Sequence, residues 1–135
     1  MKKLIRWLMA VSLLATVILT YKILSIALAD SVDYTRNDWL SFKLLASNEV
    51  INAPMLSSGA IIHYRTADGS APQIEEIEYS GSVNKNILIN YLRSSGYSEI
   101  ADPVFGSRWA LSGSNKSAYI ATEGRVLKLT FIEKR

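Results

Sequence analysis

The sequence predicts an α+β protein that consists of an N-terminal transmembrane helix and one small domain with a five-stranded antiparallel sheet and one or two helices. Three observations support this. Residues 4–29 are almost purely apolar, as in a helix that contacts the membrane interior. Short segments within residues 60–132 alternate apolar and polar side chains, which is typical of strands with one solvated face. Two further segments have helical apolar spacing, so the domain order is αββαβββ.

The apolar segment from Trp7 to Ala29 is long enough to cross a membrane. As a helix it would be about 34 Å long, against a hydrocarbon core of about 30 Å. Three basic residues precede it, and this excess of cations favours a cytoplasmic N-terminus. We therefore expect residues 1–29 to be a single-pass anchor in a bacterial inner membrane, and residues 30–135 to be one periplasmic domain.

A cleaved signal peptide is the alternative for the same segment. The uninterrupted apolar part, residues 7–20, has signal-peptide length, and Ala27-Leu28-Ala29 has the small-x-small form of a cleavage site. Against cleavage, the chain after Lys22 stays apolar and continues the helix instead of forming a short polar region. We favour a retained anchor, in which the ammonium group of Lys22 extends to the membrane surface.

Composition excludes several function classes. The chain has no cysteine, so disulfide frameworks, thiolate nucleophiles and thiolate zinc sites are ruled out. Four of the 15 cations lie in the first 29 residues, which leaves 11 cations against all 12 acidic residues in the domain. The overall charge of +3 therefore belongs to the membrane segment, and nucleic-acid binding has no support.

The first segment of the domain predicts a helix. Asp30, Ser31 and Asp33 are suitable capping residues for a helix over residues 35–48, whose apolar side chains fall on one stripe. We expect Trp39 on this stripe to be buried in the core, with an exposed partner-binding role as the alternative.

A hairpin follows, with strands over residues 60–65 and 73–79 and a turn at Asp68-Gly69. The second strand alternates, so one face is dry and the other is wet. Glu76 and Glu78 share the wet face, where paired carboxylates suit acid–base catalysis, a basic partner or simple solvation. We expect that these two carboxylates simply face solvent, and partner binding is the next alternative. Glu76 and Glu78 are therefore named as possible partner-binding residues.

The clearest helix of the domain is predicted over residues 83–95, with Ser82 as its N-cap and Gly96 as the left-handed residue after its end. We expect it to cover the dry face of the sheet. Ser82 and Lys85 also match the Ser-x-x-Lys pattern of serine acyl-transferring enzymes. The pattern is common by chance and its partner motifs are absent, so we interpret these residues as a cap and a solvated lysine.

The last part of the domain predicts a connection over residues 98–106 and three short strands over residues 107–112, 116–122 and 125–132. Glu123-Gly124 is the turn between the last two strands. Trp109 and Tyr119 on these strands are further candidates for a protein-binding surface, because aromatic side chains dominate binding hot spots.

His63 is the only histidine of the chain and lies on a predicted strand. A metal site or catalytic triad built on it would need partners that spacing does not reveal, so we expect a histidine at the border of core and solvent. No catalytic, cofactor-binding or metal residue is assigned from the sequence.

The absence of a cofactor motif and the predicted anchor favour a non-catalytic interaction protein. It would act as an accessory subunit of an envelope complex, or as an immunity-type inhibitor, with a protein partner in the envelope. A pilin-like subunit is an alternative, because a hydrophobic helix that leads into a small sheet resembles the pilin plan, although no Gly-Phe processing site precedes the helix. A small secreted hydrolase or ligand-binding protein, released after Ala29, is the alternative from a different class.

Overall fold

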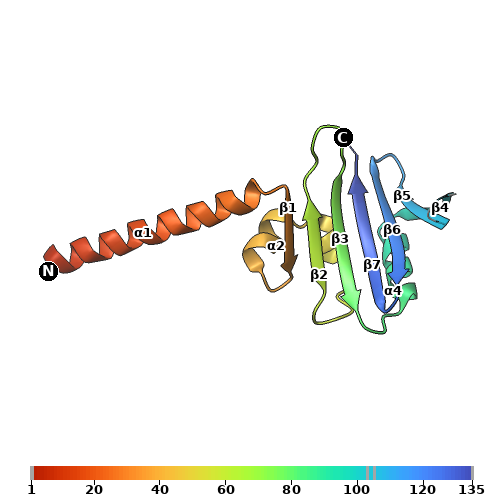
Figure 1. Ribbon diagram of the computed structural model, residues 1–135, viewed down its shortest axis with the longest axis horizontal. Helices are drawn as coiled ribbons and strands as arrows, with labels where there is room; N and C mark the ends of the chain where they lie inside the picture. The colour runs from red at the N-terminus through yellow and green to blue at the C-terminus, as the bar shows by residue number, and fades with distance from the viewer. Residues whose placement is uncertain (1, 103, 105, 135) are drawn as a thin grey trace.

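The computed structural model describes residues 2–102, 104 and 106–134. A long helix, α1 (Lys2–Ala27), extends away from a domain in which an antiparallel sheet packs against three short helices among these residues (Figure 1). Residues 3–27 of α1 are long and apolar enough to cross a membrane, by length and composition, and a signal sequence near the N-terminus has the same properties. The expected long apolar helix followed by an antiparallel sheet domain is therefore confirmed.

The sheet has seven strands, in the order β1-β2-β3-β7-β6-β5-β4. Two meanders, β1 to β3 and β4 to β7, meet where β3 pairs with β7. The strands are β1 (Ser31–Thr35), β2 (Ile61–Arg65), β3 (Gln73–Ser80), β4 (Tyr97–Asp102), β5 (Gly106–Leu111), β6 (Lys116–Glu123) and β7 (Val126–Glu133).

The prediction of five strands is wrong, because both edge strands were missed. β1 occupies Ser31–Thr35, where Asp30, Ser31 and Asp33 were expected to cap a helix. β4 occupies Tyr97–Asp102, within the expected connection, of which Pro103 and Phe105 lie outside the described residues. Each edge strand pairs with one neighbour only, so polar side chains are tolerated along it. β1 alternates polar and apolar residues over only five positions, and β4 does not alternate regularly.

Of the helix predicted over residues 35–48, only α2 (Trp39–Leu45) forms, and a second helix, α3 (Asn48–Asn52), begins at the last residue of the predicted range. The chain is extended at Ala46, and the Ser47 hydroxyl caps α3 by accepting a hydrogen bond from the N–H of Val50. Trp39 is 66% exposed, so its expected burial is also wrong.

The next helix, α4 (Lys85–Ser94), begins later than expected. Its N-cap is Asn84, whose side-chain oxygen accepts a hydrogen bond from the N–H of Asn86 at 2.9 Å, and not Ser82. Gly96 follows the helix with a φ of 87°, a left-handed conformation that glycine adopts without strain, as the sequence predicts.

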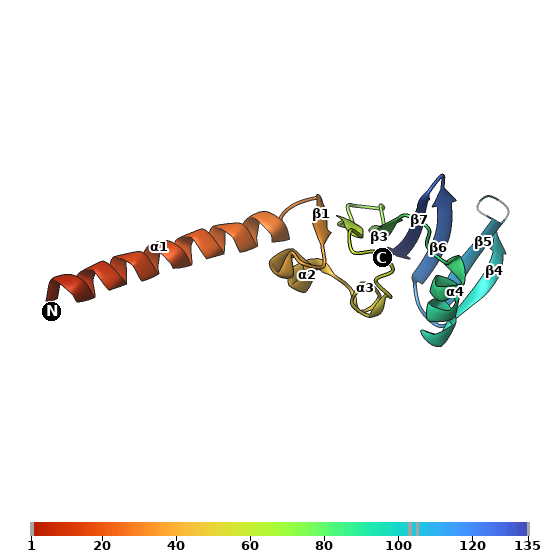
Figure 2. The same ribbon diagram turned by 90° about the horizontal axis from the view of Figure 1, so that it is seen from below.

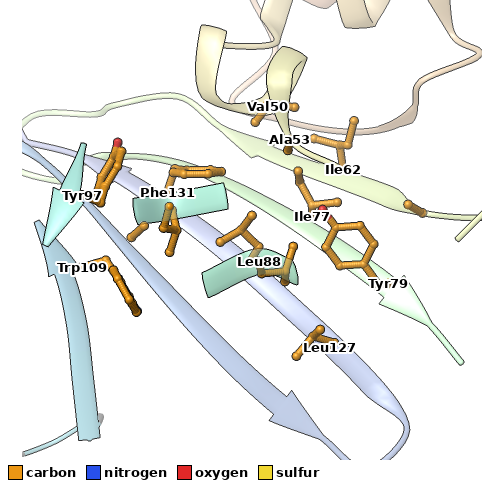
Figure 3. Packing of buried hydrophobic residues seen from close by; sticks show 14 of the residues in the cluster. Val50, Ala53, Ile62, Ile77, Tyr79, Leu88, Tyr97, Trp109, Leu127 and Phe131 are labelled. Carbon is orange, nitrogen blue, oxygen red and sulfur yellow. The ribbon is translucent and has the colours of Figure 1, made fainter. Parts of the chain in front are cut away.

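The helices α2, α3 and α4 all lie on the same side of the sheet (Figure 2). Val50 of α3 and Leu88 of α4 are fully buried against Ile62 and Ile77 on the inner face of the sheet (Figure 3). The predicted placement of the helix over the dry face, with Ile77 and Tyr79 pointing inward, is confirmed. Burial of these apolar side chains is the main contribution to the stability of the domain.

Candidate functional site

The other face of the sheet, which we call the outer face, is not covered by any of the helices that the structure describes. Strand pairing places Asp33 opposite His63, His63 opposite Glu76, and Glu76 opposite Thr130. These four residues therefore form a row across β1, β2, β3 and β7 on the outer face. Tyr119 of β6 is opposite Thr130 and extends the row.

His63 is held between two carboxylates. Its Nδ1 lies 2.8 Å from Oδ1 of Asp33, and its Nε2 lies 3.6 Å from Oε2 of Glu78. A carboxylate can only accept a hydrogen bond, so the Nδ1 atom carries the proton that points to Asp33. This leaves Nε2 directed at the carboxylates of β3.

Glu76 also has polar neighbours on the adjacent strand. The hydroxyl of Thr130 donates a hydrogen bond to Oε2 of Glu76 at 3.0 Å, and the ammonium group of Lys128 lies 3.6 Å from Oε1. Lys128 is closer to Glu123, at 3.0 Å, and this hydrogen bond together with the nearby Glu76 raises the pKa of Lys128. Lys128 therefore only partly compensates the negative charge of the carboxylates.

We refer to Asp33, His63, Glu76, Glu78 and Lys128 as the outer cluster. One ligand atom each from His63, Glu76 and Glu78 lie within 4.8 Å of one another. Such a group accepts hydrogen bonds from a basic side chain or binds a cation. The predicted pair Glu76 and Glu78 is thus brought together with a histidine. Asp33 and Lys128 were missed, because only the strand register places them here.

The adjacent part of the outer face is less polar. Tyr119, Ala121, Thr130 and Ile132 line a shallow depression over β6 and β7. The outer face therefore carries an acidic half over β1 to β3 and a more apolar half over β6 and β7.

A second polar cluster lies inside the domain, between α3 and the inner face of the sheet. Glu75 is 3% exposed, and its carboxylate accepts hydrogen bonds from the backbone N–H of Ser47 and from the side chain of Gln73, each at 3.0 Å. Burial raises the pKa of Glu75, although these hydrogen bonds oppose the effect. The position follows from strand parity, which places Glu75 on the same face as Ile77.

Glu49 and Lys116 form an ion pair beside Glu75. Nζ of Lys116 lies 2.9 Å from Oε1 of Glu49 and 3.9 Å from Oε2 of Glu133. Burial raises the pKa of Glu49, but the hydrogen bond and charge of Lys116, together with hydrogen bonds from the backbone and Ser47, outweigh burial, so the pKa of Glu49 is lowered. The Tyr91 hydroxyl donates a hydrogen bond to the backbone oxygen of Glu49. This inner cluster joins α3, α4 and β6, which is a structural role.

Ser82 and Lys85 do not form an organised catalytic pair. Ser82 lies in the loop before α4, Lys85 is the first residue of that helix, and both are exposed. A lysine that takes a proton from serine needs a desolvated position that lowers its pKa. The arrangement instead fits the interpretation of Lys85 as solvated.

The aromatic candidates do not gather at one place. Trp109 is 2% exposed and belongs to the core, with the guanidinium group of Arg93 5.7 Å from its ring centre. Trp39 is exposed on α2, which contacts the C-terminal part of α1. Tyr119 is half-buried on the outer face. Only Tyr119 lies near the outer cluster.

Comparisons with protein-family models, curated proteins and solved structures found no match for this chain.

Proposed function

We propose that this protein is a membrane-anchored, non-catalytic interaction protein whose domain lies on the periplasmic side of a bacterial inner membrane. It acts as an accessory subunit of an envelope complex or as an immunity-type inhibitor. The observation that carries the proposal is the outer face, where acidic side chains lie beside an apolar depression and none of the described helices covers them.

The chemistry of the outer face specifies the kind of partner. Asp33, Glu76, Glu78 and Glu123 bring four carboxylates to the outer face, where Lys128 pairs with two of them and Arg65 is the second cation that lines the same hollow. A partner segment with a basic side chain next to an apolar one is complementary to this surface, because the first meets the carboxylates while the second enters the depression near Tyr119.

The junction between α1 and the domain supports retention of the anchor. α2 contacts α1, and Ile23 and Ile26 are the partly buried residues toward its C-terminal end. Leu28 and Trp39 near this junction are 78% and 66% exposed. Apolar and indole side chains at this depth suit the boundary between lipid and water.

The partner is tested by capture with the full chain. The chain, tagged at the C-terminus, is cross-linked in a Gram-negative host, solubilised in several detergents and purified in EDTA. We expect a stoichiometric protein that is recovered with the native chain and lost with the double variant Glu76→Gln, Glu78→Gln. Glu99→Gln, an exposed carboxylate on the opposite edge strand β4, is the matched control. Recovery of no partner in any detergent, or equal recovery with the double variant, would contradict the proposal.

The anchor is tested by the mass and membrane partition of the purified protein. Full-length protein that stays in the membrane after a carbonate wash is the expected result. A mature form that begins at Asp30 and is free in the periplasmic extract would exclude the tether.

A further inference from the structure

We propose that the outer cluster is a binding site for a divalent transition-metal ion, best suited to Zn²⁺, with His63, Glu76 and Glu78 as protein ligands. The inference goes beyond partner binding and rests on the geometry of these side chains. One ligand atom of each lies within 4.8 Å of the others. His63 and Glu76 are directly paired between β2 and β3, and Glu78 lies two residues along β3 on the same face, so the backbone pairing fixes the spacing of the three side chains.

The imidazole of His63 is already oriented for metal binding. In the neutral imidazole, the hydrogen bond from Nδ1–H to Asp33, at 2.8 Å, selects the tautomer in which Nε2 has a free lone pair. Nε2 faces Oε2 of Glu78 at 3.6 Å, which is longer than a hydrogen bond. Zinc-bound histidines ordinarily donate their other N–H to a carboxylate in the same way.

The separation between Nε2 of His63 and Oε2 of Glu78 is close to that of two ligands in tetrahedral coordination. Ligand atoms about 2.0–2.1 Å from a zinc ion are about 3.3 Å apart in a tetrahedron. The distance from Nε2 to Oε2 of Glu78 exceeds this value by a few tenths of an ångström, so a small rotation of the side chains is enough. The three side chains are half-buried on an uncovered sheet face, which leaves the fourth position to water or to a ligand from solvent.

Lys128 is the counter-charge that an ion would replace. Its Nζ lies 3.6 Å from Oε1 of Glu76 but only 3.0 Å from Oε2 of Glu123. Binding of a metal ion needs only a shift of Lys128 toward Glu123, its closer partner. Removal of Lys128 should therefore strengthen metal binding, because it removes a positive charge next to the site.

The donor set selects the class of ion. One imidazole nitrogen and two carboxylates suit zinc and neighbouring first-row ions. Ca²⁺ and Mg²⁺ prefer all-oxygen ligands in larger number. A basic side chain could bind the same carboxylates instead of a metal ion. Unlike the metal ion, it would not need the lone pair on Nε2 of His63.

The test is calorimetric titration of the EDTA-treated and desalted full chain, in detergent and without partner, with Zn²⁺ alone. We expect one ion per chain and a loss of affinity of at least about tenfold in His63→Gln and in Glu78→Gln. Glu99→Gln is the control and should bind as the native chain does. Because His63 is the only histidine, its ring-proton NMR signals should shift as zinc is added. Failure to bind, binding that survives His63→Gln, or equal affinity for Ca²⁺ would overturn the proposal.

Two more variants separate metal binding from a purely structural ion-pair network. Asp33→Asn, which loses the acceptor charge behind His63, should weaken zinc binding by about 10- to 100-fold. Lys128→Gln should strengthen zinc binding if the outer cluster is a metal site. If the ion pairs are only structural, this variant should not bind zinc and should only have a lower free energy of unfolding. Unchanged affinity in both variants would contradict the assigned roles. Partner capture in EDTA tests the proposed function separately, so either proposal can fail alone.

Discussion

The carboxylate of Glu75 accepts a hydrogen bond from the backbone N–H of Ser47 at 3.0 Å, although Glu75 is only 3% exposed. Burial raises the pKa of Glu75 above its ordinary value of 4.5, so the folded state holds the proton more tightly than the unfolded state does. This contribution to stability is present below the unfolded pKa and is lost as pH rises through the folded pKa.

Glu75→Gln should therefore raise the free energy of unfolding at neutral pH and remove the loss of stability above about pH 4.5. Gln73 can reverse its amide to meet the new side chain, so the hydrogen bonds are preserved. Denaturant unfolding of the native chain and the variant across this pH range measures the difference. Glu99→Gln controls for the general loss of a carboxylate, and a parallel pH dependence in native chain and Glu75→Gln would refute the role of Glu75.

Leu88→Ala should lower the free energy of unfolding by about 2–5 kcal/mol, because Leu88 is fully buried between α4 and the sheet and its loss leaves a cavity. Ile87 is the next residue on the same helix and is 42% exposed, so Ile87→Ala should cost less than half as much. Equal losses of stability would show that α4 does not pack as described.

Asn84→Ala should destabilise the protein by about 1 kcal/mol, since the hydrogen bond from the N–H of Asn86 to the cap is lost. Ser82→Ala should change stability by no more than about 0.5 kcal/mol, because Ser82 is exposed and lies outside the helix. Thermal or denaturant unfolding of both variants checks this, and the reverse order would restore Ser82 as the cap.

Trp39 should lie at the lipid surface when the full chain is reconstituted in a bilayer. The fluorescence difference between the native chain and Trp39→Phe isolates its emission, and lipids brominated near the headgroup should quench it. The other two tryptophans, Trp7 of α1 and Trp109 of the core, are present in both proteins and cancel in the difference. A difference signal that these lipids leave unquenched would remove Trp39 from the interface.

The sequence predicted the parts of the fold whose patterns are strong locally. The alternation around Ile77 and Tyr79 identified β3 and its dry face, and Gly96 marked the end of α4 correctly. The strand Ser31–Thr35 is missed because Ser31 and Asp33 also suit a helix N-terminus, and because the alternation of Val32 and Tyr34 with polar residues covers only five positions.

The outer cluster was only half predictable for a different reason. Alternation along one strand places Glu76 and Glu78 on a common face. The neighbours of these residues depend on the pairing of β3 with β2 and of β3 with β7. The predicted hairpin brings the strand of His63 beside that of Glu76, but the register decides which residues face each other. Lys128 lies beyond α4, so no local spacing rule brings it to Glu76. Register is set by the whole sheet.

The pairing of β3 with β7 also determines the order in which this domain is able to fold during synthesis. β7 is the last strand along the chain, yet it lies at the centre of the sheet between β3 and β6. Until residues 126–133 have emerged from the ribosome, β3 and β6 both have an unpaired edge. The strands β1 to β3 are then not paired with the strands β4 to β6. The sheet therefore closes only after synthesis of β7. Until then, the unpaired edges of β3 and β6 are open to pairing with other chains.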